Sequence, residues 1–510
     1  MFKVALLLSV LSSVKCGNIL VLQDVPSPSH TIWNTELAKG LARKGHNVTM
    51  LGPDDFKNQK LIENFHYIEL EAIVDKGVEE AIEEAMDAPL LKNMLLFYEY
   101  EMETCKKIYE NTGMQRLLNY PDGFKFDAIV IDMTLNCMLP VIKRFKFPPS
   151  VGVTAFLFPH YLSLDFGNTI HTSYIPSYAL SITEDMNFLE RLQNFLFVNS
   201  DYLLRKYYVR KTVQRLANEK FGESLGSLDD IRRHISMLLV NVDMAFHYPQ
   251  ELAPNIIPVG GLHVKRAGQL TRDLEEIMDK GNKGVILFSL GTNVRFSLLK
   301  PHIKSALLGA LGKLDQTVLW KLDSNLTNVP SNVIVRQWLP QTEILAHPNT
   351  KLFISHGGGL STIESAYYAV PVLGIPFFAD QFPNLKLMEK KGLARIVYYN
   401  SITEDSMYKS IREMLDNPKY SKNMKDTSNR MRDQPQTPLE RAIFWIEYSI
   451  RHNGSGFLNL KSRDLPLFIT SGQDIHLFLL LLGCVTILVV VSACKCCISS
   501  MKSKHKLKTQ

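Results

Sequence analysis

Residues 338–381, WLPQTEILAHPNTKLFISHGGGLSTIESAYYAVPVLGIPFFADQ, decide the fold, because apolar runs alternate there with helical stretches. The apolar run 351–355 predicts a short buried strand, residues 356–359 a tight turn, and residues 360–369 the helix that follows it. A second buried strand is expected at 371–377. Strands that alternate with helices predict a parallel sheet covered by helices.

The same alternation extends over most of the chain. A chain of 510 residues is too long for one hydrophobic core. We therefore expect an α/β protein with two Rossmann-like doubly wound domains that face a cleft, at 17–250 and 251–450. Strands are expected at 19–23, 48–51, 128–131, 285–289, 317–322, 333–337, 352–355 and 372–375, with a helix at 31–44.

The two ends of the chain predict a secretory membrane protein. Residues 1–16 combine Lys3, an apolar run and small residues near Cys16, which is the pattern of a cleavable signal peptide. Residues 477–494 are uncharged and apolar, and are just long enough to cross the hydrocarbon core as a helix. A buried helix of a soluble protein is the alternative. Residues 451–476 form the expected juxtamembrane segment.

The last residues predict the orientation in the membrane. The tail 495–510 carries five lysines and no acidic residue, so the positive-inside tendency places it in the cytosol and the preceding chain in the lumen. Its final lysines, Lys506 and Lys508, have a spacing similar to the dilysine signals that return membrane proteins to the endoplasmic reticulum. We expect a single-pass type I protein of that membrane, with a merely basic tail as the plainer interpretation.

Charge argues against a nucleic-acid partner. The formal net charge of the whole chain is +6. The five tail lysines, together with Lys3 and Lys15, supply seven positive charges, so the predicted lumenal part carries about −1. It therefore lacks the basic footprint of a nucleic-acid-binding protein.

Cysteines and sequons are sparse in the predicted lumenal part. Of seven cysteines, only Cys105 and Cys137 lie there, and one disulfide between them is possible. Their spacing indicates no metal site. Sequons stand at Asn47, Asn325 and Asn453; Asn325 lies in the most loop-like surroundings, whereas Asn47 enters a predicted strand.

The turns of residues 338–381 carry groups suited to a nucleotide sugar. A helix that begins near Gly357 and Gly358 presents free N–H groups and its positive dipole end to an anion such as a diphosphate, and His356 adds a donor. Trp338 offers a flat face on which a base can stack. Gln341 offers both a donor and an acceptor for a pyrimidine edge.

Further polar groups follow in the same stretch. Glu364, about two turns into the predicted helix, is placed to accept hydrogen bonds from ribose hydroxyls. Asp380 and Gln381 follow a buried strand, at the sheet edge where open α/β folds bind ligands, and suit sugar hydroxyls. Each group has a plainer interpretation when taken singly: the glycines as a mere helix start, Trp338 as a core aromatic, and Glu364 as a solvated carboxylate.

A candidate base stands near the start of the chain. His30 ends the loop 24–30 after the first predicted strand, and Asp132 follows the strand 128–131, so both are expected at the carboxyl edge of one sheet. A carboxylate bonded to the second ring nitrogen fixes the tautomer of a histidine and helps it to carry a positive charge. Asp127 is the competing carboxylate, but it precedes the strand and is expected at the opposite edge.

Several motifs carry a resemblance to a known family: F-S-L-G-T at 288–292, V-G-G-L-H at 259–263, F-I-S-H-G-G at 353–358 and P-L-E-R-A-I-F-W-I-E-Y at 438–448. Over nearly its whole length the sequence resembles the membrane-bound UDP-glucuronosyltransferases and UDP-glucosyltransferases of animals. The resemblance implies a GT-B type fold whose N-terminal domain binds the acceptor and whose C-terminal domain binds the UDP-sugar. It implies that His30 is the base and that Asp132 is its partner. It also implies a set of donor contacts: Trp338 and Gln341 to the uracil, Ser289, Thr292 and His356 to the phosphates, Glu364 to the ribose, and Asp380 and Gln381 to the sugar hydroxyls.

The expected reaction is an inverting transfer of a hexosyl group from a UDP-sugar to a hydroxyl of a small lipophilic acceptor. No cofactor and no metal ion is expected, because the chain lacks the Asp-x-Asp pair of metal-dependent sugar transferases. Leu360 and Ser361 stand where many vertebrate relatives have Asn and Gly, so Ser361 is the expected substitute for a phosphate contact. Gln250 stands where relatives that use glucuronic acid tend to have Arg, which favours UDP-glucose over UDP-glucuronate.

The acceptor is less visible than the donor. Five aromatic residues suggest an apolar acceptor pocket, with ordinary core packing as the alternative: Phe156, Phe158, Phe166, Tyr174 and Tyr178. Two rival functions remain, a membrane-tethered lipophile-binding homologue without activity and a glycosyltransferase that acts on an endogenous lipid or protein. Homo- and hetero-oligomers are both compatible with the sequence.

Overall fold

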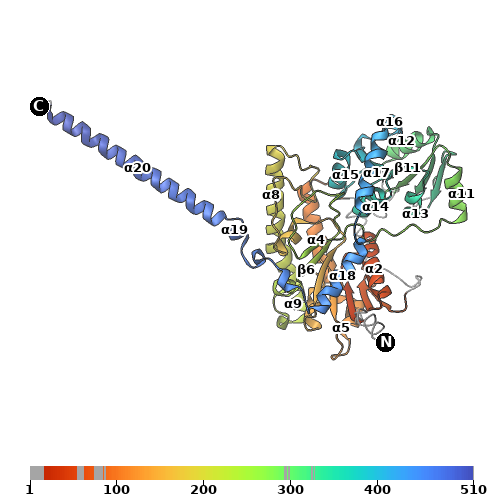
Figure 1. The fold of residues 1–510 in the computed structure, drawn as a ribbon, viewed down its shortest axis with the longest axis horizontal. Coiled ribbons are helices and arrows are strands. Elements are labelled where there is room, and N and C mark those ends of the chain that lie inside the picture. The colour runs from red at the N-terminus through yellow and green to blue at the C-terminus, as the bar shows by residue number, and fades with distance from the viewer. Residues whose placement is uncertain are drawn as a thin grey trace, which may run out of the picture. The chain divides into compact units, whose positions relative to one another are not determined.

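The structure, a computed structural model, describes residues 16–53, 62–73, 84, 88–291, 294, 296, 299–322, 326 and 328–508. The chain divides into two compact units, one that ends at Asn459 and one that begins at Leu460. The first unit contains two parallel β-sheets and the helices that connect their strands (Figure 1). The two expected doubly wound sheets are therefore present.

The N-terminal sheet has seven strands in the order β3-β2-β1-β4-β5-β6-β7. The order reverses between β1 and β4, so this parallel pair forms the switch point at which open α/β sheets bind ligands. The strands are β1 (Asn18–Leu22), β2 (Asn47–Gly52), β3 (Phe65–Glu69), β4 (Ala128–Asp132), β5 (Ser150–Thr154), β6 (Met237–Val240) and β7 (Ile256–Pro258).

The C-terminal sheet has six strands in the order β10-β9-β8-β11-β12-β13. Its switch point is the parallel pair β8 and β11. The strands are β8 (Val285–Ser289), β9 (Thr317–Lys321), β10 (Val333–Arg336), β11 (Thr350–Ser355), β12 (Val372–Gly374) and β13 (Ala394–Ile396).

Helices connect the strands and cover the sheets, as the alternation in the sequence predicts. Those of the N-terminal half are α2 (Pro28–Arg43), α4 (Leu90–Glu110), α5 (Thr112–Leu118), α6 (Leu139–Arg144), α7 (His160–Asp165), α8 (Phe188–Leu204), α9 (Arg210–Phe221) and α10 (Leu228–His234). Those that follow are α11 (Arg272–Lys280), α12 (Pro301–Gly312), α13 (Gln341–Ala346), α14 (Gly359–Tyr367), α15 (Gln381–Lys390), α16 (Glu404–Asp416), α17 (Pro418–Arg432) and α18 (Pro438–Arg451).

The eight strands expected along the whole chain are found with ends that differ by at most two residues, whereas β3, β5, β6, β7 and β13 were not predicted. Interior strands of a parallel sheet are buried on both faces and are therefore apolar throughout, which makes them visible in the sequence. β1 and β4 show this pattern, since every residue of β4 is buried. The longer apolar run 371–377 forms a strand only over Val372–Gly374.

One boundary near the site differs from expectation. Helix α2 begins at Pro28, so His30 lies in the first turn of this helix and not in the preceding loop. Pro28 favours this start, because its fixed φ suits a helix and its missing N–H has no intrahelical partner in the first turn anyway. His30 is consequently held by a regular backbone.

A helix from the far end of the first unit completes the N-terminal core. Ala442, Ile443 and Ile446 of α18 are buried in the same apolar cluster as Val21 of β1 and Val130 of β4. Helix α18 also contacts α2, and the two lie side by side in Figure 1. Residues near position 450 therefore stabilise the sheet formed by the first 260 residues.

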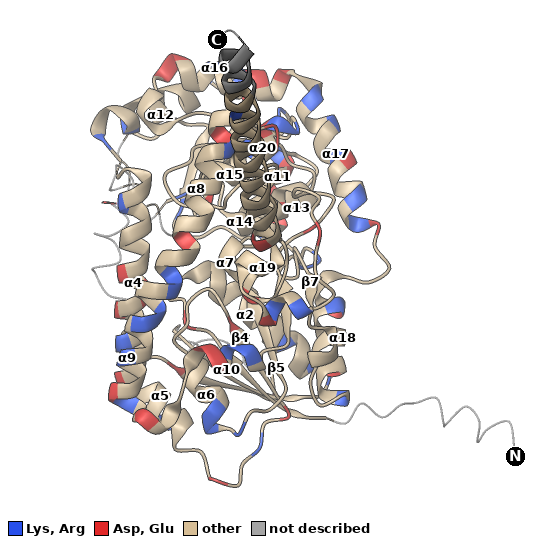
Figure 2. Ribbon diagram, turned by 90° about the vertical axis from the view of Figure 1, so that its left-hand side faces the viewer, with Lys and Arg blue, Asp and Glu red and all other residues tan. Residues whose placement is uncertain are grey.

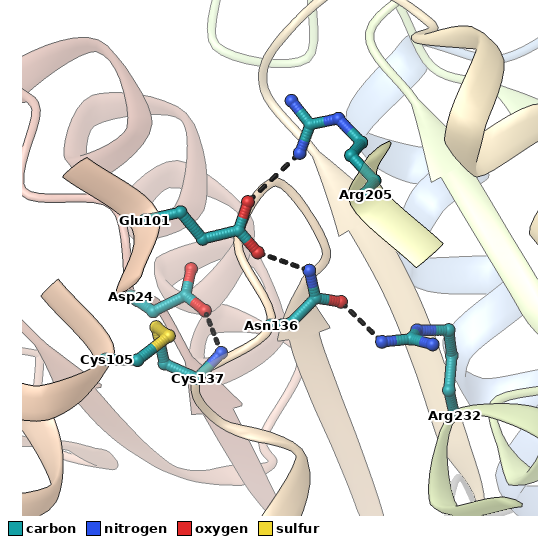
Figure 3. The surroundings of a disulfide bond; sticks show 7 residues. All are labelled: Asp24, Glu101, Cys105, Asn136, Cys137, Arg205 and Arg232. Atoms are coloured by element: carbon teal, nitrogen blue, oxygen red, sulfur yellow. Dashed lines mark hydrogen bonds and ion pairs between the residues drawn. A yellow bond between two sulfur atoms is a disulfide. The ribbon is translucent and has the colours of Figure 1, made fainter. Parts of the chain in front are cut away.

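A disulfide and buried polar groups support the opposite side of the N-terminal half (Figure 3). Cys105 of α4 is bonded to Cys137, in the loop that follows β4. In the same loop, Asn136 donates to Glu101 and accepts a hydrogen bond of 2.7 Å from Arg232. The possible disulfide of the sequence is thus present and ties α4 to this loop.

The second unit contains the predicted membrane segment. Helix α20 (Gln473–Lys508) follows the short helix α19 (Leu467–Thr470). Within the described residues, 473–500 form the one helix that is long and apolar enough to cross a membrane, judged by length and composition alone. The helix extends beyond both ends of the predicted span 477–494.

Charged residues of both signs are interspersed along the helices of the first unit in the view of Figure 2. Lysines and arginines do not gather there into a stripe of the kind that follows a nucleic-acid backbone. The distribution agrees with the near-neutral charge of this part of the chain.

Candidate functional site

His30 and Asp132 lie together at the switch point of the N-terminal sheet. Asp132 ends β4, and His30 belongs to the helix that follows β1. The distance between His30 Nδ1 and Asp132 Oδ2 is 2.7 Å, and both side chains are buried. Asp127 precedes β4 and instead accepts a hydrogen bond from the backbone N–H of Asn18. The structure thus brings together the two residues that the sequence analysis paired.

Asp132 is held in its ionised form. Burial alone raises the pKa of this carboxyl, but the neighbouring His30 and hydrogen bonds from Thr134 outweigh burial and lower the pKa below its ordinary value. The backbone N–H of Thr134 donates to Asp132 Oδ1 at 3.0 Å. An ionised carboxylate only accepts hydrogen bonds, so Nδ1 of His30 carries a proton, and in the neutral form of the ring Nε2 is left to accept one.

Asp24, in the loop between β1 and α2, is a second buried carboxyl near this pair. Burial, and next the negative charge of Asp132, raise the pKa of Asp24 well above its ordinary value. Its Oδ2 accepts a hydrogen bond of 3.2 Å from the backbone N–H of the disulfide residue Cys137. Neighbouring carboxyls whose pKa values are pushed apart can hold one charge between them without mutual repulsion.

Serines end the two central strands of the C-terminal sheet and support the turns that follow. Ser289 of β8 and Ser355 of β11 are register partners. Ser289 Oγ accepts from the N–H of Gly291 at 3.3 Å, and Ser355 Oγ accepts from the N–H of Gly357 at 3.2 Å. Ser289, a predicted phosphate contact, is therefore buried and stabilises a turn, a role that the sequence analysis missed.

The ring of His356 packs between the backbones of two glycines. A Cβ on Gly291 or Gly358 would lie 2.6 or 2.5 Å from a ring atom. Gly357 has a φ of 88°, in the left-handed region that favours glycine. Gly358 is the N-cap of α14, so this turn brings the ring and the free N–H groups of the helix to one edge.

His356 is neutral in this position. Burial, and next the positive charge of Lys321, lower the pKa of its imidazole to about 4. A neutral imidazole donates through one nitrogen only. His356 can therefore give a ligand one hydrogen bond, as expected, but no positive charge.

Lys321 supplies a positive charge that the sequence analysis missed. It ends β9, its Nζ donates to the carbonyl of Gly291 at 3.4 Å, and it lies 4.4 Å from the ring centroid of Trp338. Trp338 is 68% exposed, which excludes its interpretation as a core aromatic. The strand was predicted at 317–322, so Lys321 fell inside it, and only the observed end of β9 places this residue at the sheet edge.

Gln341 and Thr342, in the first turn of α13, both bind Glu364 of α14. Gln341 Nε2 donates to Glu364 Oε2 and, at 3.2 Å, to Ser361 Oγ, and Thr342 Oγ1 donates to Glu364 Oε1 at 3.0 Å. Glu364 is therefore not a free solvated carboxylate, and burial raises its pKa. Because the amide nitrogen of Gln341 faces the carboxylate, its oxygen remains as the acceptor for a ligand.

Asp380 and Gln381 begin α15 at the edge that carries the glycine turn. Asn384 Nδ2 donates to Asp380 Oδ2 at 2.9 Å and to the carbonyl of Gly357 at 3.0 Å. Gln381 Oε1 accepts from the backbone N–H of Phe377 at 2.8 Å. The amide nitrogen of Gln381 is therefore the part of this side chain that remains for a ligand.

Electrostatics connects the two halves of the site. Burial raises the pKa of Asp380 to about 6, and the hydrogen bond from Asn384 and the charge of His30 act in the opposite direction. His30 lies in α2, which follows strand β1 of the N-terminal sheet, and Asp380 precedes α15 of the C-terminal half. The charge of one half therefore affects the pKa of a residue in the other. An ion pair of 2.6 Å between Lys265 and Glu36 joins α2 to the segment that leads into the C-terminal sheet.

The remaining predicted residues are those outside the described part of the chain and those of the expected acceptor pocket. Thr292, the sequon residue Asn325 and most of the predicted signal peptide lie outside the described residues. Phe166 is buried in the core and Tyr174 stacks on His171. Of the five aromatics expected at the acceptor pocket, Phe156 and Tyr178 contact each other, with ring centroids 5.7 Å apart.

A group that could hold a metal ion lies elsewhere. Within the described part of the chain, this group consists of Glu275 and Asp279 of α11 with His347, and its ligand atoms lie within 4.8 Å of one another. Both carboxylates are exposed, and none of the three residues belongs to the predicted site.

The two parallel, doubly wound sheets define a fold of the GT-B type. The fold is similar to a solved structure of the glycotransferase of kitacinnamycin, with a TM-score of 0.58 and 17% sequence identity, over 85% of this chain and 99% of that chain. At this identity the likeness concerns the fold alone. It confirms the predicted fold class.

Sequence relatives give the family. The chain is 32% identical over 492 residues to "UDP-glycosyltransferase UGT5" of Dactylopius coccus, covering 95% of this chain and 93% of that protein. It is 29% identical over 520 residues to the human UDP-glucuronosyltransferase 2B10, covering 96% and 94%. The profile of the family "UDP-glucoronosyl and UDP-glucosyl transferase" matches residues 21–509. The chain belongs to this family, which confirms the predicted transferase class.

The packing of His356 predicts unequal effects of two neighbouring substitutions. Gly358→Ala places a methyl group against the His356 ring, so we expect the ring and the start of α14 to move and UDP affinity to fall roughly 10- to 100-fold. In Gly359→Ala the added atom lies 3.4 Å from Asp380 Oδ2, an ordinary contact, so UDP affinity is expected to be retained. Calorimetric titration of UDP into the purified full-length variants measures both, and equal affinities would contradict the assigned packing.

Proposed function

We propose that the protein transfers a hexosyl group from a UDP-sugar to a hydroxyl of a small lipophilic acceptor, with His30 as the general base and with inversion at the anomeric carbon. The observation that carries the proposal is the 2.7 Å contact of His30 Nδ1 with the ionised Asp132. It leaves Nε2 as a proton acceptor, and a positive charge on His30 lowers the pKa of Asp380 in the C-terminal half.

The reaction is a direct displacement. The acceptor hydroxyl gives its proton to His30 Nε2 while its oxygen forms a bond to the anomeric carbon. The bond between that carbon and the diphosphate oxygen breaks on the opposite face, and UDP takes the electron pair. Configuration therefore inverts. The negative charge of Asp132 stabilises the imidazolium that forms, as a carboxylate does beside a histidine base.

The leaving diphosphate is stabilised by groups that are already in place. The free N–H groups at the start of α14 and the dipole of this helix favour a negative charge. Lys321 adds a cation at the end of β9, and the neutral His356 adds one hydrogen bond. We propose that these groups act without a metal ion and without another cofactor.

The proposed donor is UDP-glucose, with UDP-glucuronate as the alternative. Gln250 offers no positive charge to a sugar carboxylate, whereas Asp380 and the amide of Gln381 suit neutral hydroxyls. Trp338 stacks the base, Gln341 meets its edge through the amide oxygen, and Glu364 meets the ribose. The human relative named above is a glucuronosyltransferase, so both donors belong in the test.

His30→Gln is expected to lower sugar transfer by about 10²- to 10⁴-fold, because the substituted side chain cannot take the acceptor proton. UDP affinity is expected to be unchanged, since His30 does not belong to the groups proposed to hold UDP. The assay offers labelled UDP-glucose, UDP-glucuronate and UDP-galactose with a panel of phenols to microsomes that contain the full chain.

The matched control is His171→Gln, which removes a partly exposed histidine paired with Glu251. Full activity of His30→Gln would refute the assigned base. Absence of any product from the unaltered protein would favour a lipophile-binding homologue, and transfer only to an endogenous lipid or protein would favour the biosynthetic rival. Abolition by a chelator would refute the metal-free mechanism.

Asp380 predicts a pH dependence of sugar binding. Its raised pKa of about 6 means that the carboxylate, the better acceptor for sugar hydroxyls, prevails above pH 6 and is lost below it. The Kd of UDP-glucose is therefore expected to rise as the pH falls through about 6. Asp380→Asn should remove this dependence. Calorimetry on either side of pH 6 measures it, and a Kd of the unaltered protein that stays constant would exclude the assigned role.

We also propose that the protein is anchored in the endoplasmic reticulum membrane by α20, with its catalytic unit in the lumen and residues 495–510 in the cytosol. The apolar helix and the basic tail support this orientation. Asn453 is exposed at the end of α18, whereas Asn47 lies in β2 and donates to Asn18 Oδ1 at 2.9 Å. Asn453 is therefore the more accessible glycosylation site of these two.

This topology predicts that sealed microsomes protect the protein from added protease except for its tail. We expect a glycosidase to reduce its mass, and Asn453→Gln to remove at least part of that shift. Asn47→Gln, the matched control, should keep the shift unchanged. Digestion of the catalytic unit in sealed microsomes would show that the orientation is reversed.

A further inference from the structure

We propose that Asn34 is a positioning residue that holds the carboxylate of Asp132 in line with the His30 imidazole. The inference rests on the proposed role of His30 as the base. Asn34 Nδ2 donates to Asp132 Oδ2 at 2.9 Å and to the backbone carbonyl of His30 at 3.0 Å. One amide group therefore contacts both members of the pair.

Helical spacing explains how one side chain reaches both groups. Asn34 follows His30 by four residues in α2, so the two side chains lie on the same face of the helix, one turn apart. Because β1 and β4 are neighbours in the sheet, that face meets the end of β4, where Asp132 lies. A residue at any other position of the first two turns would not share this face with His30 so closely.

The hydrogen bonds of Asp132 show what Asn34 adds. Oδ1 is held by the backbone N–H of Thr134, and Oδ2 accepts from both His30 Nδ1 and Asn34 Nδ2. With the imidazole as its only partner, Oδ2 could follow the ring as the ring moves. The second donor fixes this oxygen from the side of the helix, so the carboxylate determines the orientation of the ring.

The orientation of the Asn34 amide is set by its neighbours. Both contacts are oxygen acceptors, a carboxylate and a carbonyl, so the nitrogen faces them and the amide cannot be reversed without placing oxygen against oxygen. Among the described residues, no group donates to Asn34 Oδ1, although the residue is fully buried.

That buried oxygen argues against a purely structural role. A buried acceptor without a donor lowers the stability of the folded protein. A leucine of similar size would fill the same space without burying an unpaired oxygen. An asparagine at this position is thus a poor choice for packing alone. Its benefit lies in the donor that it presents to Asp132, which places it among residues that serve the site at the expense of local stability.

Two substitutions separate positioning from packing. Asn34→Leu keeps the volume and removes the donor, so we expect kcat to fall about 10- to 100-fold with unchanged KM for the UDP-sugar and unchanged UDP affinity. In Asn34→Asp, a protonated side chain can still donate to Asp132, whereas an ionised one repels it. Its kcat relative to the unaltered protein is therefore expected to fall as pH rises, whereas the ratio for Asn34→Leu stays constant.

The charged groups of the pair, and those whose pKa values respond to the pair, are present in every variant. They are His30 and Asp132 of the pair, Asp24 from the loop after β1, and Asp380 from α15. Dividing the pH profile of each variant by that of the unaltered protein removes their shared contribution. What remains in Asn34→Asp is the effect of the introduced carboxyl, including the shifts that it causes in the pKa values of these neighbours.

Thr35→Val is the matched control, since Thr35 is also buried, in the next position of α2, and among the described residues its hydroxyl donates only to Met50 Sδ, at 3.9 Å. It should retain the kcat of the unaltered protein. His30→Gln tests the proposed function separately: if that variant stays active, the assigned base is wrong. If His30→Gln is inactive while Asn34→Leu keeps full kcat, the positioning role of Asn34 is wrong.

A rise in KM of Asn34→Leu that accounts for its whole loss of kcat/KM would also overturn the inference, because it would point to donor binding. If Asn34→Leu fails to bind UDP and is therefore misfolded, the pH dependence of Asn34→Asp tests whether residue 34 acts as a donor to Asp132. A constant ratio of its kcat to that of the unaltered protein across the pH range would then refute the donor role, and a ratio that falls with pH would support it.

Discussion

The parallel pairing of β1 with β4, and of β8 with β11, is the constraint on which the site depends. Parallel strands end at one edge of a sheet, so residues far apart in the sequence meet there without help from a long loop. In the N-terminal sheet this pairing brings Asp132 to the helix that carries His30. In the C-terminal sheet it sets Ser289 beside Ser355, and the turn after each serine holds one side of the His356 ring.

Burial then gives each half of the site its chemistry. In the N-terminal half, neighbouring donors keep the buried Asp132 ionised, while the equally buried Asp24 has a raised pKa. The loop after β4 is fixed by the disulfide between Cys137 and Cys105 and by the hydrogen bond from Asn136 to Glu101, which also pairs with Arg205 (Figure 3). The N-terminal sheet therefore carries the pair that we propose for proton transfer. The second sheet contributes an anion-binding helix start, a neutral imidazole and one lysine, which suit a leaving diphosphate.

Much of the site was predictable from strand ends, and the misses have identifiable causes. Asp132 and Asp380 follow apolar runs, so the rule that polar residues after a strand lie at the sheet edge singled them out. Lys321 lay inside the predicted strand 317–322, and only the observed end of β9 places it at that edge. Asn34 lies inside a predicted helix, where spacing shows which residues share a face but not which neighbour that face meets. The bond of Gln341 to Glu364 joins two helices and has no signature in either segment.

The sequence by itself determined eight strands of the two sheets, the helices that follow β1 and the glycine turn, and the apolar C-terminal helix, because these follow from local periodicity and from which residues must be buried. Only the tertiary structure decided that Nδ1 of His30 meets a carboxylate 102 residues away, that Asn34 binds both, and that α18 completes the N-terminal core. Contacts of this kind depend on strand register and on the packing of helices against a sheet, to a precision of a few tenths of an ångström. Periodicity in a sequence shows on which face of a helix or strand a side chain lies, but not how far it is from a side chain of another element.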